Sequence, residues 1–361
     1  MAVNNEAGNL LGFVASVTGE QNLRVEENLG DGFVRLRVSE AERRQAKHDI
    51  RCIEDVVIEM LRNARDARAR KIFVATTRDA NTRTLVMIDD GDGIPAHMQD
   101  RIFDARVTSK LETIHTDRWG VHGRGMALFS VRENVSSAKV VTSTPGLGTS
   151  LCVVSDATKL SERADQSTWP TVGTDDDGQT SVVRGPHNIV RTCCEFAVEE
   201  RGVCEVYLGS PSEIAATLRD RCRPDDESRH LFVDDIAELP VCERLYAASD
   251  ASDFMEIAAS LGLVISERTA HRILSGQIKP LRSVLARLMH RSDPSTPAEV
   301  DLMKDRRGLK VSSDDLGEFS RMMERDFSYL ADRYYLSLSA APHVRVTKNR
   351  ILVSFDLDKP D

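Results

Sequence analysis

Three polar side chains early in the chain have the types and spacing of a hydrolytic site: Glu59, Asn63 and Asp66. Residues three and four positions apart lie on one side of an α-helix, so a carboxylate and a carboxamide would meet there. Mg²⁺ needs few protein oxygens, because it keeps waters and phosphate oxygens as ligands. Asn63 can therefore hold the metal, which leaves Glu59 to polarise an attacking water. The alternative is an ordinary solvated helix face.

A second group, Asp89-Asp-Gly91-Asp-Gly93, follows an apolar, β-prone run. A carboxylate at a strand end can accept a hydrogen bond from the exocyclic amine of adenine. The two glycines lack the β-carbons that would block the approach of a base to the backbone. Such a string alone is typical of a turn. A calcium loop is excluded, because no glutamate stands at the required distance. Ile94, the next residue, joins the candidates for nucleotide contact.

A third group is rich in glycine and precedes a segment, 126–134, with the pattern of a helix. The first turn of a helix presents free amide groups, which attract phosphate. Glycines let the backbone wrap closely around a triphosphate and suit a lid that orders when nucleotide arrives. The candidate phosphate-binding residues are Gly120, Val121, His122, Gly123, Arg124, Gly125 and Met126.

Two shorter segments complete the pattern. The sequence Thr108-Ser109-Lys110 precedes the glycine-rich loop, and Lys110 is a candidate phosphate contact, although lysines on loops are mostly solvated. Gly148-Thr149 closes a turn between two expected strands, 138–143 and 150–154, and Thr149 is a candidate contact near the adenine.

Taken in order, these motifs resemble the nucleotide-binding signature of the GHKL superfamily, which includes gyrase, Hsp90, histidine kinases and MutL. The resemblance runs from residue 54 to residue 151 and is closest to the Hsp90-like and MutL-like members; Thr-Ser-Lys is a feature of the MutL-like members in particular. It implies a two-layer α/β sandwich of the Bergerat type, within an α+β chain, that binds ATP and Mg²⁺. It assigns Glu59 as general base, Asn63 as metal ligand and Asp89 as the residue that reads adenine. It also adds Asp66 and Ala67 to the nucleotide-binding residues.

The chain departs from the family pattern at several points. Asp90 stands where an asparagine is common, and Met126 stands where MutL proteins have a glutamate. A second-domain lysine motif is not found either, and these three departures together argue against a mismatch-repair protein. His48 lies too close to Asn63 to be the phosphoacceptor of a two-component kinase, which argues against a standard sensor kinase.

The elements that would position these residues can be predicted from hydrophobic spacing. An apolar stripe predicts a helix over 53–70, and two β-prone runs, 71–78 and 84–89, predict a hairpin. A strand is expected over 33–38. Ser39 and Glu42 have the spacing of a capping box that opens a helix toward His48.

The sequence predicts four segments: an N-terminal segment (1–32), the ATP-binding domain (33–155), a linker or long surface loop rich in Ser, Thr, Asp and Gly (156–188), and a mixed, mostly helical second domain (189–361). Within the last segment we expect a strand over 204–208, helices over 212–221 and 317–335, and a terminal hairpin formed by 343–346 and 350–355.

Residues 254–274 resemble a helix-turn-helix whose turn is about two residues longer than the usual connection. From Asp253 to Arg291 there are six Lys or Arg and three acids, a local charge of +3 in a chain with a net charge of −9. This segment, 254–291, could bind a nucleic-acid backbone. The alternative is a helical hairpin that transmits the nucleotide state or packs against a partner.

Composition limits the remaining classes. A net charge of −9 argues against broad coating of nucleic acid, and 361 residues suffice for two domains. No secretory signal or stretch of about 20 apolar residues is evident, so no membrane association is expected. The seven cysteines include no CxxC pair, which argues against a zinc site or a disulfide framework. A reduced, cytoplasmic environment is predicted.

Three functions fit the sequence. The first is a slow, Mg²⁺-dependent ATPase in which a lid over 104–122 closes on ATP and a second domain moves in response. For this switch the resemblance implies ATP-dependent homodimerisation, and we expect an unidentified protein partner. The second is a protein kinase of the anti-sigma or histidine-kinase type, and the third is an ATP-gated DNA-binding regulator.

Overall fold

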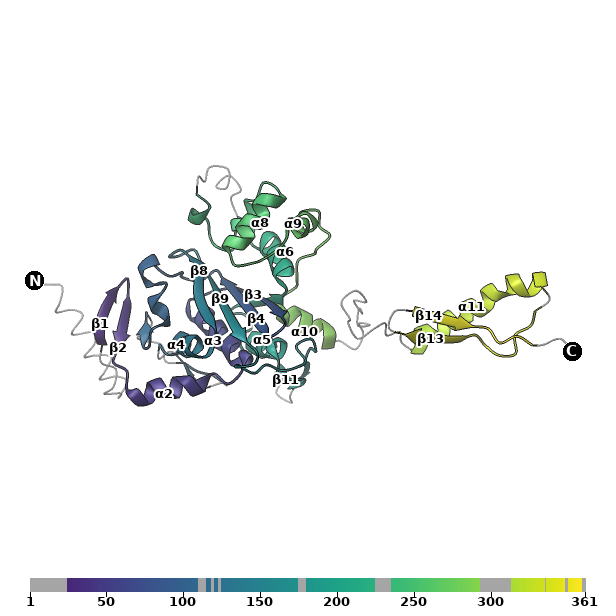
Figure 1. Ribbon diagram of the computed structural model, residues 1–361, viewed down its shortest axis with the longest axis horizontal. Helices are drawn as coiled ribbons and strands as arrows, with labels where there is room; N and C mark the ends of the chain where they lie inside the picture. Colours follow the sequence, from purple (N-terminus) through teal and green to yellow (C-terminus); the bar gives the residue numbers. More distant parts are fainter. Residues whose placement is uncertain are drawn as a thin grey trace, which may run out of the picture. The chain divides into compact units, whose positions relative to one another are not determined.

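The computed structural model describes residues 25–109, 115–117, 120–122, 125–174, 180–224, 235–292, 313–334, 336–347 and 350–358 (Figure 1). Three candidate residues, Lys110, Gly123 and Arg124, lie outside these ranges. Contacts along the chain group it into two compact units, Met1–Asp293 and Pro294–Asp361.

The first unit is built on a five-stranded mixed sheet with the strand order β12-β3-β4-β9-β8. The strands are β3 (Lys71–Asp79), β4 (Thr82–Asp89), β8 (Ser137–Ser143), β9 (Thr149–Asp156) and β12 (Glu205–Gly209). β12 is parallel to β3, and the other neighbours are antiparallel. The two predicted hairpins are therefore confirmed, each with slightly longer strands than expected.

Helices cover both faces of this sheet (Figure 1). One core joins the sheet to α3 (Ile53–Asp66), α4 (Ala127–Asn134), α5 (Ile189–Glu199) and α10 (Val284–Ser292). A second core joins the other face to α6 (Pro211–Arg221), α8 (Ala251–Ser260) and α9 (Glu267–Leu274). The chain is thus a mixed α+β protein, with an α/β sandwich extended by a helical region.

Covering both faces explains the sequence of the central strands. Ile72 and Val74 are buried in the first core, whereas Phe73 and Ala75 are buried in the second. A strand buried on both faces has a continuous apolar run rather than an alternating one. Phe73 stacks on Tyr207 of β12, with ring centroids 5.0 Å apart, which fixes the edge strand to the sheet.

The helix that carries the candidate hydrolytic residues is shorter than the sequence predicted. α3 ends at Asp66, with Ala67 as its C-cap, instead of continuing to residue 70. Arg68 adopts a left-handed conformation with φ of 61°, which a continuing right-handed helix does not permit. Likewise the predicted strand 33–38 ends early, since β2 is Phe33–Leu36.

The N-terminal elements pack beside the sandwich as a separate small sheet. It has the order β1-β2-β5, from β1 (Val25–Gly30), β2 and β5 (Val107–Thr108). α2 (Glu40–Asp49) begins with the predicted capping box: the Ser39 hydroxyl accepts from the Glu42 amide, and the Glu42 carboxylate accepts from the Ser39 amide.

The segment 156–188, predicted as a linker or long loop, contains ordered structure. It includes a hairpin of β10 (Thr171–Thr174) and β11 (Thr180–Arg184), and Leu160 and Val182 are buried. The Gln166 amide also donates to Glu54 of α3 at 2.7 Å. By contacts, this segment and 189–293 belong to the same unit as the sandwich, because β12 extends its sheet. The four-segment division into separately folding domains stays a prediction.

Short elements connect the larger ones: η1 (Ala96–Met98), η2 (Arg101–Phe103), β6 (His115–Asp117), β7 (Gly120–His122), η3 (Ile236–Glu238) and η4 (Arg244–Tyr246).

The second unit contains α11 (Ser313–Tyr334) and a hairpin of β13 (His343–Thr347) and β14 (Arg350–Ser354), so the helix and the terminal hairpin expected there are confirmed. Phe327 stacks on Phe355 with centroids 4.9 Å apart. No helix among the described residues is long and apolar enough to cross a membrane.

Candidate functional site

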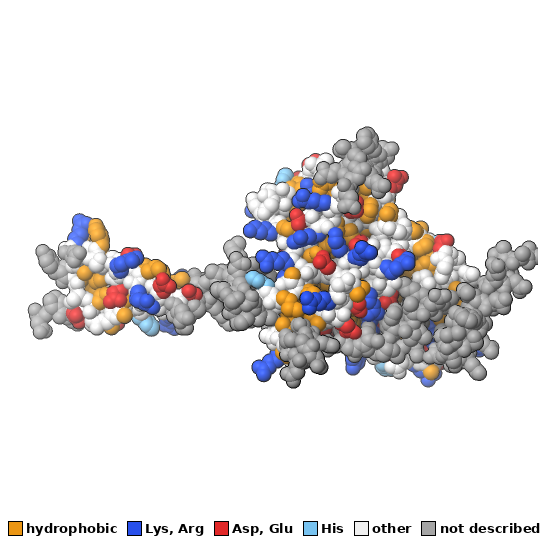
Figure 2. Space-filling model, turned by 180° about the vertical axis from the view of Figure 1, so that it is seen from behind, with side chains coloured by type: hydrophobic (Ala, Val, Ile, Leu, Met, Phe, Trp, Pro, Cys, Tyr) orange, Lys and Arg blue, Asp and Glu red, His pale blue; other side chains and the backbone are white. Residues whose placement is uncertain are grey.

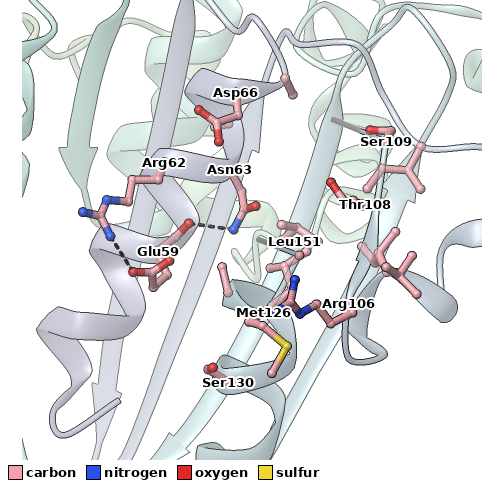
Figure 3. A pocket seen from close by; sticks show the side chains of 18 of the residues that line it. Glu59, Arg62, Asn63, Asp66, Arg106, Thr108, Ser109, Met126, Ser130 and Leu151 are labelled. Carbon is pink, nitrogen blue, oxygen red and sulfur yellow. Dashed lines mark hydrogen bonds and ion pairs between the residues drawn. The ribbon is translucent and has the colours of Figure 1, made fainter. Parts of the chain in front are cut away.

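A cavity of about 480 Å³ opens between α2, α3, α4 and the end of the sheet that carries Asp89. Its volume falls in the range of small-ligand sites, roughly 300–1,000 Å³. Eleven of the residues singled out from the sequence line it: Glu59, Asn63, Asp66, Ala67, Asp89, Gly93, Ile94, Thr108, Gly125, Met126 and Thr149. The fold therefore brings together residues from five segments that are far apart in the chain (Figure 3).

The other candidates are placed differently. Gly91 does not line the cavity, although it lies next to residues that do. The backbone of Gly120, Val121 and His122 forms β7, which pairs with β6 in a two-stranded hairpin. The side chains of Val121 and His122 lie outside the described part of the structure, as do Lys110, Gly123 and Arg124.

α3 presents its polar residues to the cavity from one side (Figure 3). The Asn63 side-chain nitrogen donates to the Glu59 backbone carbonyl at 2.7 Å. Because that bond uses the amide nitrogen, the carboxamide oxygen is the atom left to bind a cation. The donor set thus fits a magnesium ion that takes one protein oxygen. The described residues contain no group of three or more His, Cys, Asp or Glu side chains that could hold a metal ion.

Glu59 is held by a neighbouring arginine that the sequence analysis missed. Nη1 of Arg62 donates to Oε1 of Glu59 at 2.8 Å, and both side chains are largely buried. The i, i+3 spacing on α3 was the available signal. Asp66, one turn from Asn63, accepts from Nε of Arg65 at 3.0 Å.

Asp89 and Thr149 lie together because they are partners across the β4–β9 ladder. Asp89 is only 4% exposed, and its Oδ1 accepts the Gly91 amide at 2.9 Å. The Thr149 hydroxyl is 2.9 Å from the hydroxyl of Ser143 on β8. Register between strands thus explains why two motifs 60 residues apart in sequence share one wall of the cavity.

Gly93 and Gly148 are required by the packing of the chain itself. A β-carbon on Gly148 would lie 2.3 Å from the Asp89 carbonyl oxygen, and one on Gly93 would lie 2.0 Å from that of Thr144. Asp90 also has an internal role, since its carboxylate accepts the Arg70 and Lys71 amides at 2.7 and 2.8 Å. These two bonds give Asp90 a role in holding the start of β3, and an asparagine oxygen could accept them equally well.

Residues 48–159 match the model of the family described as histidine kinase-, DNA gyrase B- and HSP90-like ATPase. These residues form a GHKL-type ATPase domain. Membership supports ATP binding and an activity of the ATPase or kinase type, and domains of this family usually bind ATP with Mg²⁺. No curated protein matches the chain. The resemblance to the superfamily is confirmed, whereas closeness to Hsp90 or MutL stays a prediction.

The thiols add no second reactive centre. All seven cysteines, which fall within the described ranges, are free. Burial raises the pKa of Cys52 to about 11 and the pKa of Cys204 to about 12. Both side chains therefore stay protonated at neutral pH and are poor nucleophiles.

Proposed function

We propose that the chain is a Mg²⁺-dependent ATPase that hydrolyses ATP slowly and changes conformation with its nucleotide state. One observation carries this proposal: the cavity of the ATPase domain is lined by Glu59 and Asn63 on one side and by Asp89 and Thr149 on another. Hydrolysis of bound ATP requires a base for the attacking water, a ligand for the metal and groups that bind the nucleotide, and these residues have the chemical types for those roles.

Each part takes a role that follows from its chemistry. Asp89 accepts a hydrogen bond from the adenine amine, and Thr149 lies beside it. The phosphates lie near the start of α4, where Met126 provides no side-chain cap for the first amides. Asn63 holds Mg²⁺, which neutralises phosphate charge, and Glu59, oriented by Arg62, accepts a proton from the attacking water.

Phosphate release from Mg²⁺·ATP by wild type and by Glu59→Ala tests this proposal. A positioned general base contributes about 10²- to 10⁴-fold to a rate, so the variant should bind ATP and lose at least about 100-fold in turnover. Glu256→Ala, which removes an exposed glutamate on α8, serves as the control and should turn over at the wild-type rate. If Glu59→Ala releases phosphate at the wild-type rate, Glu59 is not the general base.

The same pocket could transfer the γ-phosphate to a protein instead of water. Incubation with γ-labelled ATP separates the two outcomes, because a kinase leaves label on a protein and an ATPase releases it as phosphate. Thr108 and Asp66, which belong to motifs typical of the ATPase branch, favour release. Stable label on a protein would move the proposal to the kinase branch.

A nucleic-acid partner is a second candidate, supported by the helices at 254–274. On α9, Ala270 and Ile273 are buried, whereas Arg268, His271 and Arg272 are exposed. Figure 2 shows further Lys and Arg side chains spread over one face of the larger unit. Exposed guanidinium groups on a short helix suit contact with phosphates.

Salt-dependent binding of duplex DNA tests this second candidate. Arg268→Ala/Arg272→Ala should weaken binding and lower its salt dependence. Arg44→Ala/Arg51→Ala removes two exposed arginines elsewhere and should change binding little. Equal effects of the two pairs, or no binding by wild type, would remove nucleic acid from consideration.

A further inference from the structure

Two arginines stand among the described residues that line the cavity, and only one of them contacts the proposed base. Arg62 is paired with Glu59. The other, Arg106, comes from the turn before β5 and extends into the cavity from the side opposite α3 (Figure 3). The candidates chosen from the sequence in this segment were Thr108 and Lys110, so Arg106 has no role in the proposal above.

Arg106 is buried but incompletely satisfied. The residue is 5% exposed, and one end of its guanidinium forms an ion pair with Glu42 of α2. Its Nε is buried and has no hydrogen-bond partner. A buried charged group with an unmatched donor is costly unless a further acceptor completes it. The guanidinium of Arg106 therefore lacks one acceptor that an anion in the cavity could supply.

The backbone holds Arg106 in place at a conformational cost. Its φ is 60°, a left-handed conformation that is uncommon for residues other than glycine. Two hydrogen bonds fix it: the Arg106 amide donates to the Gly125 carbonyl at 2.8 Å, and the Leu36 amide donates to the Arg106 carbonyl at 2.9 Å. Strain of this kind is retained where the surrounding structure requires a residue in one position.

That position is beside the start of α4, where the phosphates are proposed to lie. Gly125, one residue before the N-cap Met126, packs so closely on this turn that a β-carbon would lie 2.9 Å from the Val107 carbonyl oxygen. The first amides of α4 and the Arg106 side chain therefore face the same part of the cavity. Amide groups and a guanidinium together form a typical phosphate site.

The charge of the cavity favours a cation at this place. Its described lining contains six acids and two arginines. The acids are Glu42, Asp49, Glu59, Asp66, Asp89 and Asp92. A triphosphate entering this field would be repelled unless cations offset the acids, and Mg²⁺ alone carries two charges.

We propose that Arg106 binds a phosphate of the nucleotide, and that Glu42 is the anion it releases when the nucleotide enters. This inference rests on the proposed binding of ATP in this cavity. A phosphate offers a guanidinium two acceptor oxygens in the geometry that it prefers, whereas Glu42 contacts Arg106 through Oε1 alone, because its Oε2 accepts from Ser39.

Glu42 is suited to give up this contact. Its side chain is 35% exposed, and its Oε2 accepts from the Ser39 amide at 2.9 Å and from the Ser39 hydroxyl at 3.0 Å. Burial alone would raise the pKa of Glu42, but hydrogen bonds from Ser39 and Arg106 lower it below its ordinary value. The two bonds from Ser39 do not involve Arg106, so they continue to hold the carboxylate at the start of α2 after Arg106 leaves. The exchange breaks the ion pair that joins α2 to the cavity wall. Binding of nucleotide would therefore change how firmly α2 is held.

Titration of Arg106→Gln with Mg²⁺·ATP and with adenosine tests the phosphate contact. A charge-assisted contact to one phosphate predicts about tenfold or greater loss of ATP affinity, with adenosine affinity within about twofold of wild type. Arg35→Gln is the matched control, since Arg35 pairs with Glu27 and Asp104 nearby but does not line the cavity. Arg106→Lys, which keeps the charge, should retain part of the ATP affinity and guards against loss of folding in the glutamine variant.

Glu42→Gln tests the exchange, because glutamine preserves the capping box. Without a competing carboxylate, ATP should bind about three- to tenfold more tightly, and this gain should vanish in the Arg106→Gln background. Hydrogen exchange of α2 amides should rise when wild type binds ATP but not when it binds adenosine.

The outcomes separate the two proposals. If wild type binds neither ATP nor adenosine, the proposed function fails. If wild type binds ATP and Arg106→Gln, shown to be folded by its thermal transition, binds it equally well, only the role of Arg106 is overturned. An equal effect of Glu42→Gln in both backgrounds would overturn the exchange.

Discussion

At the scale of single residues, the account depends on which atoms of each side chain are used. Asn63 uses its nitrogen to bond the Glu59 carbonyl one turn earlier, and this bond turns its oxygen toward the cavity. Residue types and spacing on α3 were sufficient to select Glu59 and Asn63 from the sequence. Arg62 was missed although its i, i+3 spacing to Glu59 on α3 was visible, whereas Arg106 could not be selected, because the partner of its guanidinium lies on a separate segment, α2, that folds against it.

Asn63→Ala tests the metal role of this side chain. We expect the variant to bind ATP with the same affinity in Mg²⁺ and in EDTA, since the protein oxygen that links metal to enzyme is gone, whereas wild type should bind more tightly in Mg²⁺. Calorimetric titration gives both affinities.

Asn134→Ala is the control for this test, because Asn134 makes the same side-chain bond to the carbonyl one turn earlier, at 2.9 Å to Ser130 on α4. It should keep the wild-type dependence on Mg²⁺. If Asn63→Ala also keeps that dependence, Asn63 does not hold the metal.

At the scale of elements, the site depends on strand register and on where helices end. The hairpins, the capping box at Ser39 and the helix at 127–134 follow from local patterns, and they were predictable. The early end of α3 at Asp66 was not, because it depends on a left-handed residue, Arg68, that no glycine marks. The hairpin at 171–184 was also missed, because its polar strands gain their burial from neighbours distant in sequence.

Gly148→Ala tests the close approach of β9 to β4. Both Gly148 and Gly202 have positive φ, 95° and 83°, so an alanine is strained at either position by roughly 1–2 kcal/mol. Only Gly148 has a neighbour in the way, the Asp89 carbonyl oxygen at 2.3 Å, while Gly202 has open space.

We therefore expect Gly148→Ala to lose more stability to urea than Gly202→Ala, and to lose ATP affinity as Asp89 shifts. Gly202→Ala should bind ATP as wild type does. Equal destabilisation with ATP binding preserved in both variants would contradict the packing described for β9.

At the scale of the whole molecule, contacts that are distant in sequence decide the architecture. A fold with an ATP-binding sandwich was predictable from its motifs, but the addition of β12 to that sheet was not. Parallel pairing of β12 with β3 joins residues separated by the intervening domain, and nothing local in either strand encodes it. The helices α6, α8 and α9 then cover the second face of the sheet rather than standing apart.

Buried thiols give the larger unit a dependence on alkaline pH. Burial raises the pKa of Cys52 to about 11 and of Cys204 to about 12, above the value of about 8.5 for an unfolded cysteine. Groups with a raised folded pKa contribute fully below the unfolded pKa and lose that contribution as pH rises. Urea unfolding should therefore show stability falling from about pH 8.5 toward pH 12, less steeply in Cys204→Ala than in wild type. An identical slope in the two proteins would contradict this assignment.

The central claim is that this cavity binds ATP through Asp89, and a calorimetric titration with ATP of wild type and Asp89→Asn tests it most directly. The oxygen of an asparagine side chain can still accept a hydrogen bond from the Gly91 amide. Its nitrogen then faces the amine of adenine, and because both groups are hydrogen-bond donors, no bond can form between them. We predict binding by wild type and about tenfold or greater loss in the variant, with a smaller loss for inosine triphosphate, whose exocyclic oxygen accepts. Absence of ATP binding by wild type, or equal binding by both proteins, would contradict the account.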